Sequence, residues 1–208
     1  MAIKTFSSGE VLTASDTNTY LANSGLVYLG AVSYTSAGAV SANNVFTSAY
    51  RNYRIVGAHA PSSGLANFRM RLRASSTDQT GANYQFTSAR LYVNNAQDQY
   101  GSGQNYTQLA NGGIANFQFC FTIDIFAPQV NTDTLWNADC SNFEGSSAGV
   151  RWWAMGGYKA AYQADGFTLY PTAGTWTGQL YIYGYRNPSR TRHAPNTTHK
   201  QAKPFKLN

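Results

Sequence analysis

Two stretches of this chain alternate apolar and polar residues with a strict period of two. In residues 68–73, Phe, Met and Leu alternate with three arginines, and in residues 117–125 five apolar residues alternate with Gln, Cys, Thr and Asp. Only an extended strand places every second side chain on one face, so each stretch predicts a strand with one buried face. The pattern therefore favours antiparallel β structure.

The rest of the chain after Gly25 is also typical of strands. Further strands are predicted over residues 26–34, 53–59, 85–93, 134–143, 150–162, 166–170 and 176–185. Turn-forming sequences separate them at residues 61–64, 101–103, 111–113 and 171–174. Eight to ten short strands in a chain of 208 residues predict a mainly β, antiparallel β-sandwich of jelly-roll-like type.

One helix is predicted, over residues 14–23. Thr13 can cap its backbone, Asp16 has the spacing of a capping box, and Gly25 can end it. A helix this short is not stable alone, so it must pack on its own domain or on a neighbour. The predicted organisation is an N-terminal docking arm with a helix (1–25), a β-sandwich domain (26–186) and a basic C-terminal arm (187–208).

The net charge of +6 comes from the C-terminal end. Six of the fifteen basic residues lie beyond Tyr185, which leaves nine basic residues against all nine acidic ones before it. A basic tail is either a solvated arm or a segment that docks on acidic protein or on nucleic acid. We favour docking on protein and do not expect nucleic acid as a partner.

No residue pattern predicts an active site. His59 is the one histidine outside the tail, and residues 145–149 have the Gly-x-Ser-x-Gly spacing without the strand-to-helix context of a nucleophile elbow. Asp124, Asp139 and Glu144 are the candidates for the carboxylate pair of a glycosidase. Surface carboxylates near a hairpin are common, so we predict a protein that is not an enzyme, without catalytic, cofactor-binding or metal-binding residues.

Cys120 and Cys140 are too few for a metal site. If residues 127–133 form a turn centred near Val130, the two cysteines lie opposite each other and could form a disulfide. Assembly in a cytoplasm favours two free thiols instead.

Two sets of side chains are open to more than one interpretation. The Arg69, Arg71 and Arg73 stripe fits a phosphate or sugar-acid ligand, although a solvated or subunit-facing strand is the commoner role. The aromatic residues fit a sugar-stacking platform, but more commonly serve as core or interface anchors. They are Trp136, Trp152, Trp153, Trp176, Tyr181, Tyr183 and Tyr185.

Three stretches resemble structural proteins of tailed bacteriophages, of the tail-fibre or minor-tail type. Residues 6–21 read FSSGEVLTASDTNTYL, similar to an opening with Phe-x-x-Gly-(Asp or Glu)-Val-Leu-Thr-Ala followed by a short helix with Asn-x-Tyr-Leu. Residues 165–186 are similar to the last strands of such proteins, and residues 45–56 also fit. Residues 187–208 depart from the pattern, because such proteins often end near the Tyr-Gly-Tyr sequence.

The resemblance implies a virion component, made in the host bacterial cytoplasm, whose N-terminal segment serves attachment. We expect a homo-oligomer, with a trimer favoured, that binds other virion proteins and has a host surface glycan as a further candidate partner. No membrane segment is expected, since no apolar run approaches about 18 residues. The predicted partner-docking residues are Phe6, Val11, Leu12, Tyr20, Leu21, Arg190, Arg192, Lys200, Lys203 and Lys206.

Three functions remain open from the sequence. A tail or tail-fibre subunit is favoured by the opening motif. A capsid decoration protein that clamps neighbouring shell subunits is favoured by the basic arm. A carbohydrate-binding or carbohydrate-cleaving module is the third.

Overall fold

The computed structural model describes residues 8–11, 13–14, 25–62, 66–92, 95–113, 117–144 and 148–186. Thirteen elements lie within this part of the chain and all are β-strands, so the protein is mainly β, as the sequence predicts. The predicted helix falls on residues 14–23, of which only Ala14 is among those described, and it stays a prediction. Most of the two predicted arms also lies outside the described residues.

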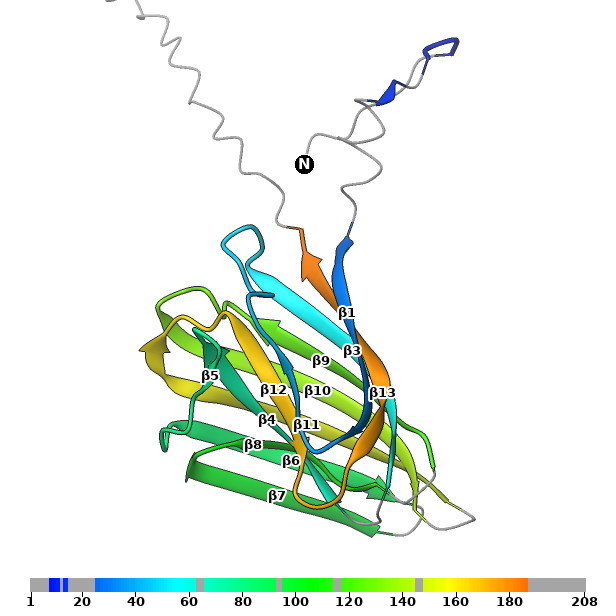
Figure 1. Ribbon diagram of the computed structural model, residues 1–208, viewed down its shortest axis with the longest axis vertical. Helices are drawn as coiled ribbons and strands as arrows, with labels where there is room; N and C mark the ends of the chain where they lie inside the picture. The colour runs from blue at the N-terminus through cyan, green and yellow to red at the C-terminus, as the bar shows by residue number, and fades with distance from the viewer. Residues whose placement is uncertain are drawn as a thin grey trace, which may run out of the picture.

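The strands form two antiparallel sheets (Figure 1). The larger sheet has eight strands in the order β1 (Leu26–Ala37), β13 (Trp176–Tyr185), β3 (Asn52–Pro61), β9 (Phe119–Phe126), β10 (Thr132–Glu144), β11 (Ala148–Tyr162), β6 (Tyr84–Tyr92) and β7 (Asn95–Gln104). The smaller sheet has the order β2 (Val40–Ala42), β12 (Gly166–Pro171), β4 (Ala66–Ala74) and β5 (Thr77–Asp78), with β8 (Thr107–Gly113) paired to β4.

One hydrophobic core lies between the two sheets. Phe68, Met70 and Leu72 of β4 face it from the smaller sheet, as their alternation predicts, while Ile123 and Ile125 of β9 face it from the larger one. Full burial of a side chain of this size stabilises the fold by roughly 1.5–3 kcal/mol. In these two strands the period-two pattern of the sequence therefore predicts correctly which side chains face the core.

The nine predicted strands are all present, with ends within a few residues of those expected. Strands β7 and β8 were not predicted. Residues 101–103 and 111–113, predicted to be turns, lie within these two strands. β7 pairs with β6 along its length, and the Phe86 ring lies where a side chain at position 101 would be: a Cβ at Gly101 would be 2.4 Å from Cε1 of Phe86. Glycine at position 101 permits this close packing. From the local sequence alone, a glycine needed for packing within a strand cannot be told from a glycine in a turn.

The register of the β9–β10 hairpin also differs from the prediction. Cys140 lies opposite Phe121, and Cys120 lies opposite Ser141, one residue away from the expected pairing. The turn contains Ala127 with a φ of 54°, and the register centres it between residues 130 and 131. A shift of one residue moves a side chain to the other face of the sheet. Cys140 is therefore buried and Cys120 exposed, and both are free thiols, the favoured alternative.

Candidate interaction surface

The described part of the predicted docking arms is small. Val11 is the one predicted docking residue that the structure describes, and its side chain is 78% exposed. The others lie outside the described residues: Phe6, Leu12, Tyr20, Leu21, Arg190, Arg192, Lys200, Lys203 and Lys206.

Both arms join the body at one place. Leu26, the first residue of β1, pairs with Tyr185, the last residue of β13, and the backbone N–H of Arg186 donates to the carbonyl of Gly25 over 3.1 Å. Figure 1 shows β1 and β13 reaching the same end of the body. The two arms, which lie at opposite ends of the sequence, thus start from neighbouring strands at the edge of the larger sheet.

The face of the larger sheet that points away from the core, here called the outer face, carries many exposed apolar side chains. Tyr100 of β7 is 85% exposed and Met155 of β11 is 63% exposed. An apolar surface of this extent on a folded domain marks an interaction site more often than chance exposure does. Its exposed large apolar residues include Tyr28, Leu91, Tyr100, Leu135, Phe143, Trp153, Met155 and Tyr181.

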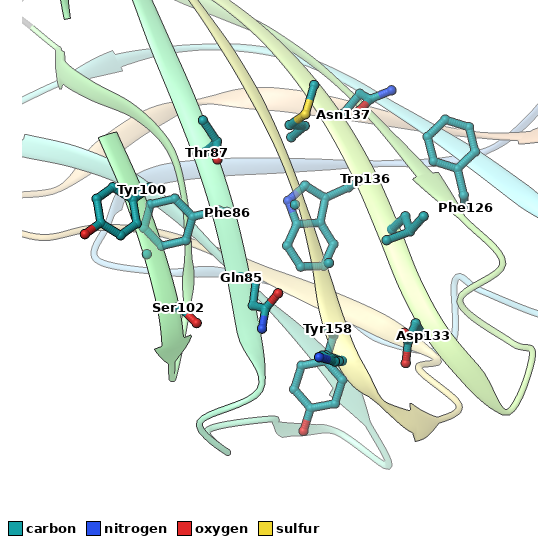
Figure 2. A pocket seen from close by; sticks show the side chains of 16 residues that line it. Gln85, Phe86, Thr87, Tyr100, Ser102, Phe126, Asp133, Trp136, Asn137 and Tyr158 are labelled. Carbon is teal, nitrogen blue, oxygen red and sulfur yellow. The ribbon is translucent and has the colours of Figure 1, made fainter. Parts of the chain in front are cut away.

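An apolar groove of about 660 Å³ crosses one half of the outer face (Figure 2). Figure 2 shows it between Tyr100 on one side and Phe126 on the other. Gly157 of β11 leaves its floor open between Leu135 and Gln85, the residues paired with it on either side. A Cβ at Gly157 would lie 2.8 Å from Cδ2 of Leu135, so a larger residue here would displace the Leu135 side chain that lines the groove.

A second, more polar groove of about 960 Å³ lies nearer to β13. At its side, Arg54 donates to both carboxylate oxygens of Asp124 over 2.8 and 2.6 Å, and the hydroxyl of Tyr185 donates to the same carboxylate over 2.7 Å. Burial alone would raise the pKa of Asp124, but the hydrogen bonds from Arg54 and Tyr185 outweigh it and hold the pKa below its ordinary value. Burial, followed by the bond to Asp124, raises the pKa of Tyr185 to about 12.

The candidate glycosidase carboxylates are separately engaged. Asp124 is held by Arg54, while Asp139 forms a bidentate ion pair with Arg151, and Glu144 has no described side chain. A general acid at neutral pH needs a raised pKa, whereas that of Asp124 is lowered. The chemistry of this pair is that of a fixed surface charge network rather than of proton transfer.

His59 lies near the end of β3, in line with its interpretation as a strand-end residue, and its side chain belongs to the buried core. Its side chain is 3% exposed, and its ring stacks between Phe119 at 4.9 Å and Trp176 at 4.3 Å. The hydroxyl of Tyr34 lies 3.3 Å from Nδ1. Burial lowers the pKa of His59 to about 3, so the ring is neutral and shielded from solvent at pH 7.

The aromatic residues do not form one platform. Trp136, Trp152 and Trp176 are buried in the core, whereas Trp153 and Tyr181 are exposed on the outer face beside the polar groove. The guanidinium of Arg151 covers part of the Trp153 ring, 4.8 Å from its centre.

The arginine stripe of β4 is engaged within the chain. Arg73 pairs with Asp78 and donates to Thr168 over 2.7 Å, while Arg69 lies 3.7 Å above the ring of Tyr106. Arg71 lies 4.8 Å above another tyrosine ring. These contacts within the smaller sheet account for the stripe without a bound anion.

Leu135, Met155 and Tyr100 were not predicted to be surface residues of an interaction site. The sequence does indicate a second apolar face for β10 and β11, because both strands carry apolar residues in both phases of the alternation: Leu135 precedes Trp136, and Met155 follows Ala154. Apolar residues in both phases indicate a strand with both faces covered. Here one face is covered by the core and the other is open in the single chain.

Within the described residues, no helix has the length and apolar character needed to cross a membrane, and no cluster of three or more His, Cys, Asp or Glu side chains could hold a metal ion. Comparison with protein-family models, with curated proteins and with solved structures finds no match.

Proposed function

We propose that this chain is a non-enzymatic structural subunit of a tailed-phage virion, a component of the tail or tail fibre that docks on neighbouring subunits. The observation that carries the proposal is the outer face of the larger sheet, with its apolar groove and widely exposed Met155 and Tyr100. Exposure of such an apolar face to water is unfavourable in free energy, and association with a partner would remove this penalty. The resemblance of residues 6–21 and 165–186 to tail proteins supplies the class of assembly.

The joint exit of the two arms supports docking by both. Because Gly25 and Arg186 are hydrogen-bonded neighbours, the N-terminal and C-terminal segments can contact the same partner. Val11, exposed in the described part of the arm, is available for apolar contacts. Basic residues from Arg190 to Lys206 would add charge-assisted contacts with acidic groups of that partner.

The finer features of the fold and assembly belong to the same proposal. The chain passes between the two sheets several times, which is compatible with a jelly-roll-like sandwich. A closed homo-oligomer, with a trimer favoured, would bury part of the outer face. Other virion proteins are its expected partners, and the exposed Trp153 and Tyr181 make a host surface glycan a further candidate ligand.

Deletion of residues 187–208 tests the role of the basic arm. The deletion leaves Arg186 and its hydrogen bond to Gly25 in place, so we expect a folded body by circular dichroism but at least about tenfold lower incorporation into phage particles. A matched control keeps the full length and replaces Arg190, Arg192, Lys200, Lys203 and Lys206 with serine. Equal loss in both variants assigns the effect to charge, and incorporation at the wild-type level in both contradicts docking by this arm.

A capsid decoration protein is the second candidate, favoured by the six positive charges after Tyr185. Immunogold labelling of intact particles separates the two locations. Label on the tail supports the proposed function, and label spread over the head shows that the protein clamps the shell. Absence of label from purified particles contradicts both.

A further inference from the structure

Among the residues that the structure describes, β13 is the strand paired with β1, which makes β1 one edge of the larger sheet. It is 12 residues long, pairs with β13 on one side, and none of its residues is buried. Val32 and Tyr34 face the core but are only half-buried, although they pack against core residues. The hydrophobic layer therefore continues to the edge and is not closed there.

The edge also lacks the charged residues and proline that commonly keep sheet edges apart. Neither β1 nor its neighbour β13 contains an Asp, Glu, Lys or Arg, whereas each of the other six strands in this sheet contains at least one. Edge strands of soluble proteins are commonly protected from other strands by charge, proline or short length. β1 is long, uncharged and free of proline, and its two register shifts, near Leu29 and between Tyr34 and Ala37, leave a regular segment from Gly30 to Tyr34.

The side chains along this edge have the composition of a protein interface. Tyr28 of β1 and Tyr181 of β13 are exposed on the outer face, and the Tyr28 ring contacts that of Tyr183 edge to face with 5.8 Å between ring centres. Interface cores are poor in charged residues and rich in tyrosine. The opposite edge differs, since β7 carries Asp98.

We propose that the β1 edge binds the β1 edge of a second copy of this chain, with the two strands antiparallel across a twofold axis. Antiparallel strand edges are self-complementary in backbone hydrogen bonding, so one edge serves both copies. Two copies with net charge +6 each would repel through a charged edge, but this edge has no charge to oppose the contact. Pairing would also cover Val32 and Tyr34 and so close the core.

The inference rests on the homo-oligomeric part of the proposed function and names the surface involved. A twofold contact joins copies in pairs, so the assembly contains an even number of chains, and trimers would occur as two trimers joined through their β1 edges. Both arms start at one end of this edge, at Gly25 and Arg186, so antiparallel pairing would place the arms of the two copies at opposite ends of the joined edge.

The test uses the full chain and a matched pair of substitutions. Ser33 on β1 and Thr77 on β5 are both exposed hydroxyl residues on strands at a sheet edge. Ser33→Lys places two lysines near each other across the proposed twofold axis, whereas Thr77→Lys places one on the edge of the smaller sheet, which the proposal leaves unpaired. Sedimentation velocity over a range of concentrations gives the mass and the dissociation constant of each variant, and circular dichroism checks its fold.

We expect an even number of wild-type copies, a dissociation constant at least about tenfold higher for Ser33→Lys, and an unchanged constant for Thr77→Lys. If Ser33→Lys does not fold, Ala31→Lys, at another exposed position of β1, replaces it. A single-chain mass at all concentrations, an odd number of copies, or equal effects of Ser33→Lys and Thr77→Lys would overturn the proposal. These results do not depend on incorporation into particles, which tests the virion assignment separately.

Discussion

His59 links the stability of the core to pH, and its replacement by phenylalanine isolates this link. The ring lies between Phe119 and Trp176 in a buried aromatic cluster, where burial lowers its pKa to about 3 from an ordinary value of 6.5. The unfolded chain therefore binds a proton below pH 6.5 that the folded chain does not. Stability from the neutral ring is fully present above pH 6.5 and is lost as the pH falls from 6.5 toward about 3.

The size of the effect follows from the same two pKa values. Each pH unit within this window costs about 1.4 kcal/mol of unfolding free energy, so a fall from pH 7 to pH 5 costs about 2 kcal/mol through His59. In His59→Phe this loss is absent. The variant also loses the contact between Nδ1 and the Tyr34 hydroxyl, a change that lowers stability equally at both pH values and cancels in the comparison.

Urea denaturation of the wild type and of His59→Phe, at pH 7 and pH 5 and at one protein concentration, measures the four free energies. The wild type should lose about 2 kcal/mol more than the variant between the two pH values. Asp124, with its pKa held below the ordinary carboxyl range, titrates at lower pH in both proteins and does not enter the difference. Equal losses in the two proteins would refute the buried, neutral histidine.

Two further predictions concern the larger sheet. Gly57→Ala places a Cβ 2.4 Å from Cζ of Phe121, so we expect the free energy of unfolding to fall by about 1–3 kcal/mol. Gly149→Ala is the control: its new Cβ has no heavy atom within 4 Å, so the free energy of unfolding should change by less than about 0.5 kcal/mol. Equal effects of the two substitutions in urea denaturation would contradict the close contact at Gly57. One thiol should react with Ellman's reagent in the native protein and a second only after denaturation, because Cys120 is exposed and Cys140 buried. Retention of the native reaction in Cys120→Ser would contradict the register of the β9–β10 hairpin.

The candidate site was only partly predictable. The resemblance of residues 6–21 pointed to docking segments, yet those residues lie mostly outside the described part of the chain, and the outer face was not expected. Leu135 and Met155 come from different strands, and only sheet pairing places them with Tyr100 of β7 on one face. A linear sequence shows that β10 and β11 have two apolar phases, but not which phase meets the core.

The sequence by itself determined nine of the strands, and the buried face of those with a single apolar phase. Alternation is a local property of an extended backbone, so Phe68, Met70 and Leu72 indicated a buried face without knowledge of any partner strand. Only the tertiary structure decided the order of the strands, the register and the edges. Those depend on pairing between distant residues, such as Leu26 with Tyr185, and on turn geometry, such as that of Ala127, where one residue reverses the faces of a whole strand.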